Sequence, residues 1–175
     1  MKFKDIPSFM DWRNYTITVP WSDLEAKLDG YRKDYNLDLD PDFQRGHVWT
    51  PEKQSAYVEY IMRGGDTSKN VIFNCPGWNG AFEGQMVLVD GKQRLEAVLS
   101  FLSNKVAIFG GHYYQDIEEN PRRYQRFTFN FHVADLARKD VLRLYLELNS
   151  GGVVHTEEEL EKVRKLIAEE ANNGN

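Results

Sequence analysis

The residues with the clearest chemical potential follow one another at positions 90–94: Asp90, Gly91, Lys92, Gln93 and Arg94. Ammonium and guanidinium groups both bind anions, and a guanidinium can give two parallel hydrogen bonds to a single one. At the start of a helix, unpaired backbone N–H groups and the positive end of the helix dipole also favour an anion. If a helix begins here, these five residues predict a phosphate site.

The flanking residues provide the elements that would position this site. Val87–Val89 is an apolar, β-branched run that predicts a buried strand, and Asp90-Gly91 then interrupts it. After the turn, apolar residues recur with the spacing of one helix face, at Leu95, Val98, Leu99 and Leu102. Strand, tight turn and helix is the expected geometry. Asp-Gly is also a common turn and Lys, Gln and Arg are ordinary first-turn residues, so the motif alone leaves a purely structural role open.

Three stretches, in order, resemble one known family. Residues 90–94 are similar to the Asp-Gly-Gln-Gln-Arg motif in the N-terminal domain of GmrSD-type modification-dependent restriction enzymes, a motif also found in phosphorothioate-sensing defence proteins. Residues 41–49, Pro-Asp-Phe-Gln-Arg-Gly-His-Val-Trp, resemble the family's Pro-x-Phe-Gln-Arg-x-x-Val-Trp opening. Residues 148–153 and then Glu159-Leu160 resemble its Leu-Asn-(Ser/Thr)-Gly-Gly segment and the short helix that follows. Lys92 stands where the family usually has Gln.

The resemblance implies a fold and a function. The family belongs to the ParB/sulfiredoxin-like group, which implies an α/β (α+β) fold with a small mixed sheet flanked by helices. It also implies a nucleotide-binding domain that hydrolyses NTP with Mg²⁺ and is linked to DNA recognition, restriction or anti-restriction. The alternative is a non-catalytic regulatory or interaction module that binds a nucleotide or a DNA phosphate. The charge of Lys92 favours binding over turnover.

Roles for individual residues follow from matching positions. Arg94 would bind a phosphate oxygen and stabilise developing charge, Asp90 would hold Mg²⁺ or orient a water molecule, and Gln93 would position that water. These three are the expected catalytic residues. The expected nucleotide- and phosphate-binding residues are Gln44, Arg45, Gly91, Lys92, Arg94, Asn149 and Gly151.

Restriction enzymes of this family also carry a C-terminal HNH-type nuclease domain. The present sequence stops soon after the Asn-Ser-Gly-Gly segment. We therefore expect no DNA cleavage by that route unless a partner chain supplies it. The size is compatible with a stand-alone phage or mobile-element protein, with DNA or a nuclease or host-defence protein as its partner.

Composition predicts one soluble globular domain at residues 15–170, with an N-terminal arm at 1–14 and a frayed tail at 171–175. The net charge of −5 argues against a protein that coats nucleic acid through bulk charge. One dense basic cluster, Arg122, Arg123 and Arg126, could still contact a DNA backbone. A solvated charged loop is the alternative for that cluster.

A single cysteine, Cys75, excludes an internal disulfide and predicts a cytoplasmic protein. It ends an apolar run, so we expect a packing residue rather than a nucleophile. The four histidines match no standard zinc spacing, and no apolar run reaches the ~20 residues of a membrane span.

The remaining patterns predict further elements. They are a strand at Tyr15–Val19, a helix from a capping box at Ser22 to about Tyr35, a helix opened by Thr50-Pro51, strands at Val71–Asn74, Lys105–Phe109 and Phe127–Phe131, a helix from about Asp135 to Leu148, and a last helix opened by a capping box at Thr156.

Overall fold

The computed structural model describes residues 15–46, 48–78, 80, 84–118, 125–149 and 157–173. Its elements, in chain order, are β1 (Tyr15–Pro20), a 3₁₀ turn (Trp21–Asp23), α1 (Leu24–Tyr35), α2 (Pro51–Met62), β2 (Asn70–Asn74), β3 (Val87–Asp90), α3 (Lys92–Leu102), a second 3₁₀ turn (Tyr114–Asp116), β4 (Thr128–Ala134), α5 (Arg138–Asn149) and α6 (Glu157–Asn173). Arg122, Arg123, Gly151 and Thr156 lie outside these ranges.

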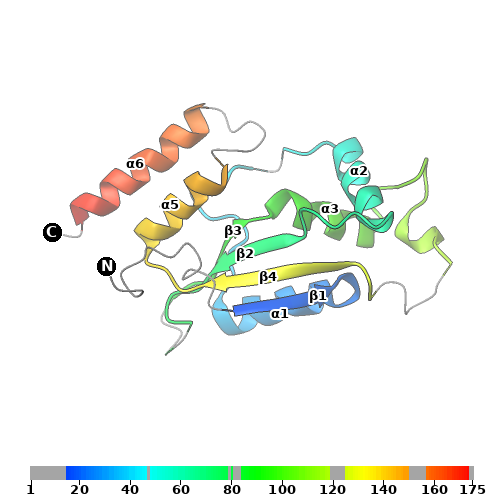
Figure 1. Ribbon diagram of the computed structural model, residues 1–175, viewed down its shortest axis with the longest axis horizontal. Coiled ribbons are helices and arrows are strands. Elements are labelled where there is room, and N and C mark those ends of the chain that lie inside the picture. The colour runs from blue at the N-terminus through cyan, green and yellow to red at the C-terminus, as the bar shows by residue number, and fades with distance from the viewer. Residues whose placement is uncertain are drawn as a thin grey trace, which may run out of the picture.

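The four strands form one mixed sheet in the order β1-β4-β2-β3, with helices on both faces (Figure 1). β4 is antiparallel to β1 and parallel to β2, and β2 is antiparallel to β3. The expected small mixed sheet flanked by helices is therefore confirmed. Pairing of Ile72 with Asp90 brings the end of β3 next to the start of β2, and this is where the 90–94 motif begins.

One face of the sheet carries the main apolar core. Phe129 and Phe131 are fully buried on β4, as the alternation in residues 127–131 predicts. Their ring centroids lie 4.9–6.2 Å from those of Phe73, Tyr31 and Trp21. Burial of one such side chain contributes about 1.5–3 kcal/mol, so this face anchors the domain. Helices α1, α2 and α3 supply the other side of the core.

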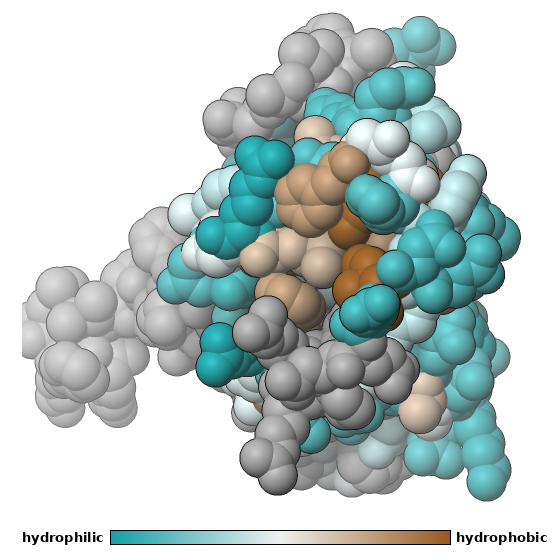
Figure 2. Space-filling model, turned by 90° about the vertical axis from the view of Figure 1, so that its right-hand side faces the viewer, coloured by the Kyte–Doolittle hydropathy of each residue, from teal (hydrophilic) through white to brown (hydrophobic). Residues whose placement is uncertain are grey.

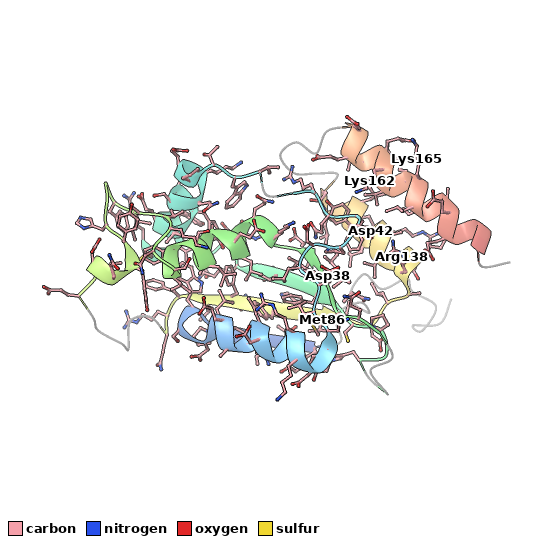
Figure 3. The ribbon with its side chains drawn as sticks, turned by 180° about the vertical axis from the view of Figure 1, so that it is seen from behind. Asp38, Asp42, Met86, Arg138, Lys162 and Lys165 are labelled. Atoms are coloured by element: carbon pink, nitrogen blue, oxygen red, sulfur yellow. The ribbon has the colours of Figure 1, made fainter. Side chains whose placement is uncertain are left out.

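The opposite face is covered by α5, with α6 packed outside it. Ile72 and Val89 of the sheet pack with Tyr145 and other apolar residues of α5, and with Val163 of α6. Arg138 of α5 donates hydrogen bonds to Asp42 at 2.6 Å and to Glu170 at 3.1 Å (Figure 3). These two ion pairs tie the segment after α1 and the last helix to α5.

The chain after α1 runs along the outer edge of β3 and satisfies its backbone. Asp38 N–H donates to Met86 O at 2.8 Å and Asp38 O accepts from Leu88 N–H at 2.9 Å. Further along, the Gln44 side chain caps two more carbonyls of the same strand. Phe43 between them is buried against Tyr145, with ring centroids 5.3 Å apart. An edge strand covered in this way offers few open groups to another chain.

Several local expectations are confirmed. The Thr50 hydroxyl accepts from Lys53 N–H and caps α2, with Pro51 at its first position. Cys75 is fully buried, and burial, with a smaller contribution from Asp135, raises the pKa of its thiol. It is a packing residue.

Two expectations are wrong. Ser22 does not cap α1, because Trp21 N–H donates to Phe127 O at 2.8 Å and the chain makes a 3₁₀ turn before α1 begins at Leu24. In the described residues 103–118 there is no strand at 105–109 either, and an isolated bridge joins Ile108 to His112. Three successive residues with positive φ, Phe109, Gly110 and Gly111, make this turn too tight for paired strands.

The end of the molecule formed by α2 and the loop after α3 carries an apolar patch (Figure 2). Phe109 and Tyr60 are among the most exposed large apolar side chains of the described chain. Nearby, Arg126 lines a shallow depression with Arg63 and Lys69. Among the helices that the structure describes, none has the length and apolar character needed to cross a membrane.

Candidate anion-binding site at the start of α3

The turn between β3 and α3 depends on Gly91. This residue is the N-cap of α3 and has φ = 101°, a left-handed conformation that other residues rarely adopt. A Cβ atom here would lie 3.1–3.2 Å from Val71 and from the Asn70 carbonyl. Glycine therefore sets both the sharp turn and the close packing of α3 on β2.

Arg94 holds the turn from inside the helix. Its Nη2 atom donates to Asp90 Oδ2 at 2.6 Å and to Asn70 O at 3.0 Å, which links α3 to β3 and β2. Both side chains are about a quarter exposed, at 21% for Arg94 and 28% for Asp90, so the pair faces solvent on one side. The Arg94 guanidinium thus has a fixed position, and its Nε atom is buried without a hydrogen-bond partner among the described residues.

Gln93 links the motif at residues 90–94 to the motif at residues 41–49. Its Oε1 atom accepts from Val48 N–H at 3.0 Å and Trp49 N–H at 3.1 Å, and its Nε2 atom donates to Gly46 O at 3.1 Å. One side chain therefore holds three backbone groups, those of Gly46, Val48 and Trp49.

Lys92 likewise links the start of α3 to two residues before Gly46, namely Asp40 and Arg45. Its side chain is 8% exposed, and Nζ donates to Asp40 Oδ1 at 2.5 Å and to Arg45 O at 3.3 Å. This contact fixes the backbone at Arg45, whose side chain comes from the first motif.

A cavity of about 360 Å³ lies where these segments meet. Its described lining consists of Gln44, Arg45, Trp49, Lys53, Val89, Asp90, Gly91, Lys92, Gln93, Arg94, Tyr145, Leu148 and Asn149. All three sequence motifs contribute, although they are separated by about 45 and 55 residues in the chain. Every expected nucleotide-binding or catalytic residue within the described ranges lines this one cavity. Gly151 is outside those ranges.

Lys53 and Tyr145 also line the cavity, although no sequence motif indicated them. The Lys53 ammonium lies 5.4 Å from the centre of the Trp49 ring, and the i, i+4 spacing of these two residues at the start of α2 was the available signal. Tyr145 and Asn149 have the same spacing on α5, where Asn149 Nδ2 donates to Tyr145 O at 2.7 Å.

The cavity is positive in charge although the chain as a whole has a net charge of −5. Four cationic side chains line it, against the carboxylate of Asp90 in the lining and that of Asp40, which pairs with Lys92. Among the described residues no side chain caps α3 and no acidic residue lies in its first turn, so the helix dipole is not neutralised there. Burial raises the pKa of Tyr145 to about 12, despite the opposing effect of nearby Arg45. The Tyr145 side of the cavity is therefore uncharged. The arrangement suits a phosphate group.

The donor set also bears on magnesium. Mg²⁺ usually binds one or two protein carboxylates and completes its shell with water and substrate phosphates. Asp90 can supply one carboxylate oxygen, since its other oxygen accepts from Arg94. Within the described ranges no three His, Cys, Asp or Glu side chains are grouped to hold a metal. The residues therefore fit an ion that arrives with a triphosphate.

Residues 24–141 match the family described as the GmrSD restriction endonuclease, N-terminal domain. The chain belongs to this family. The matched range contains residues 41–49 and 90–94 and ends before Asn149. None of the curated proteins compared with the chain is a match.

Among solved structures, the chain is similar to the C-terminally truncated chromosome-partitioning protein ParB from Caulobacter crescentus, complexed with CTP-γ-S. The sequence identity is 15% and the TM-score 0.42. The similarity covers 81% of this chain and 56% of that ParB chain.

Proposed function

We propose that this domain binds a nucleoside triphosphate, with the phosphates at the start of α3. The observation that carries the proposal is the convergence of three separate motifs on one cavity that combines four cations with an unneutralised helix N-terminus. A triphosphate has the charge and length to contact several of these groups at once.

The geometry divides the residues into two roles. Arg45, Lys53 and Arg94 are the proposed phosphate ligands, and Asp90 would bind the accompanying Mg²⁺. Gln93 and Lys92 have a positioning role. They hold Asp40, the Arg45 carbonyl and the backbone groups of Gly46, Val48 and Trp49 at the start of α3, and so fix the backbone at Arg45.

Binding has more support than hydrolysis. A catalytic Gln must leave its amide available to a water molecule, but three backbone groups occupy the Gln93 amide. Asp90 retains one oxygen atom that could orient a water. We therefore propose a nucleotide-binding module, with phosphate release that is slow or absent.

The family description refers to a restriction endonuclease. We propose that nucleotide binding in this chain serves restriction or its inhibition, with DNA or a nuclease as the partner. The Arg122, Arg123 and Arg126 cluster is the proposed DNA contact.

The test combines affinity and turnover. ATP, GTP and CTP with Mg²⁺ are titrated calorimetrically into the wild type and phosphate release is followed in parallel. Arg94→Ala should weaken binding about 100-fold, because a charge-assisted donor to the phosphate is lost. Arg32→Ala, an exposed arginine of α1 remote from the cavity lining, is the matched control and should bind as the wild type does.

Saturable binding that depends on Arg94, without phosphate release, is the expected result. Rapid release that Arg94→Ala abolishes would overturn the non-catalytic assignment and establish an NTPase. No binding by a folded wild type would overturn the proposed function itself.

A further inference from the structure

Gln44 presents a hydrogen-bond acceptor of fixed orientation at the cavity. Its Nε2 atom donates to Leu88 O at 3.0 Å and to Val89 O at 2.8 Å. Only the nitrogen of the amide can donate to carbonyls, so Oε1 must be the atom that points away from β3. Turning the amide over would bring its oxygen against two carbonyl oxygens, which is repulsive. The orientation is therefore imposed by the strand edge.

The Oε1 atom has no protein partner among the residues that the structure describes. Gln44 is half-buried and lines the cavity. The cationic side chains Arg45, Lys53 and Arg94 of the lining are donors, whereas the Asp90 carboxylate is an acceptor already paired with Arg94 through one oxygen. An acceptor held beside several donors distinguishes the two kinds of group on a ligand.

We infer that Gln44 Oε1 accepts a hydrogen bond from an N–H or O–H donor on the nucleoside part of the ligand. This inference rests on the proposed function. Phosphates carry acceptors and match the cationic wall, whereas the ribose hydroxyls and the exocyclic amino group of a base carry donors. Gln44 thereby makes the site selective, because a ligand without the donor leaves the fixed oxygen unpaired.

Matched nucleotide pairs test the inference and separate its two chemical sources. Affinities are measured for a ribonucleotide and its 2′-deoxy and 3′-deoxy forms, and for ATP and CTP against their analogues without the exocyclic amino group. The wild type should bind the donor-bearing member of one pair about tenfold more tightly, the size of one well-placed hydrogen bond. The pair that shows the difference identifies the sugar or the base as the donor.

Two variants assign that selectivity to Gln44. Gln44→Met has nearly the same length but no acceptor, and it should reduce the affinity ratio to about 1 by removing that hydrogen bond. Lys53→Ala is the control, since loss of a phosphate contact weakens both members of a pair and leaves their ratio unchanged.

Three results separate this inference from the proposed function. Wild-type ratios that all lie close to 1 overturn the inference, even if Gln44→Met does not fold. A ratio that survives in Gln44→Met also overturns it. In both cases nucleotide binding, and so the proposed function, stands. Absence of any nucleotide binding overturns the proposed function and the inference with it.

Discussion

The cavity at the start of α3 and a larger one towards its end differ in volume and in charge. The larger cavity, about 660 Å³, is lined by residues of α1, α2 and α3 and by Lys105. Its carboxylates are Glu25, Asp29 and Glu96, and its cations are Arg32 and Lys105. The smaller cavity, about 360 Å³, has four cations and one carboxylate.

We propose the smaller cavity as the ligand site because of its charge, not its volume. The two ends of one helix carry opposite partial charges, and the side chains around each end repeat the same polarity. The electrostatics therefore favour an anion at the start of α3 more than at the cavity near its end.

The largest expected effect comes from Gly91→Ala. The substitution combines a left-handed φ with Cβ contacts of 3.1–3.2 Å to β2, and should lower the free energy of unfolding by about 3 kcal/mol and abolish nucleotide binding. Urea denaturation measures the stability. Gly64→Ala is the control: φ is +97° but nothing lies within 4 Å of its Cβ, so strain alone should cost about 1 kcal/mol. Equal losses in the two variants would refute the close-packing role of Gly91.

Lys53→Ala should weaken nucleotide binding about fivefold and reduce its dependence on salt, because an exposed ammonium contributes one screened phosphate contact. Lys33→Ala removes an equally exposed lysine from α1, away from the cavity, and should change neither quantity. Titrations at two salt concentrations measure both. If the two variants behave alike, Lys53 is not a phosphate ligand.

Lys92→Gln restores the usual family residue and separates positioning from ligand contact. Its ammonium is engaged by Asp40 and the Arg45 carbonyl, so the substitution should cost about 1 kcal/mol of stability and change affinity less than threefold. Thermal unfolding measures the change in stability, and calorimetry measures the change in affinity. A tenfold loss of affinity with unchanged stability would instead make Lys92 a direct ligand.

The smallest effect is an alkaline one. The folded-state pKa of Tyr145, about 12, lies above the ordinary value near 10, so the unfolded chain loses its proton first. The contribution of Tyr145 to the free energy of unfolding is complete below pH 10 and is lost as the pH rises towards 12. Tyr145→Phe should therefore lose less stability than the wild type between pH 10 and pH 12. An identical decline in the two proteins would contradict the assignment.

Local structure could largely be predicted from the sequence. The strand, turn and helix around Asp90-Gly91 follow from β-branched residues, a glycine and i, i+3, i+4 spacing, and the cap at Thr50 from a hydroxyl followed by proline. The exceptions depend on distant partners. Trp21 forms a 3₁₀ turn because its backbone bonds to Phe127, more than a hundred residues away.

The candidate site could be predicted only in part. Sequence motifs indicated which stretches belong together, but the order β1-β4-β2-β3 depends on pairings between distant strands that no local pattern contains. These pairings also determine where α2 and α5 lie, and so bring Lys53 and Tyr145 to the cavity. The structure also shows Gln44, Lys92 and Gln93 holding backbone groups, contacts that residue type and spacing do not specify.

The most direct test of the anion site is a titration followed by amide NMR. Tripolyphosphate, which has the charge of a triphosphate without a nucleoside, is added to the wild type while backbone signals are recorded. We expect saturable shifts at Gly91, Lys92 and Gln93 and unchanged signals at Ser100 and Ser103 in the larger cavity. Shifts at Ser100 and Ser103 with none at Gly91 would contradict this expectation.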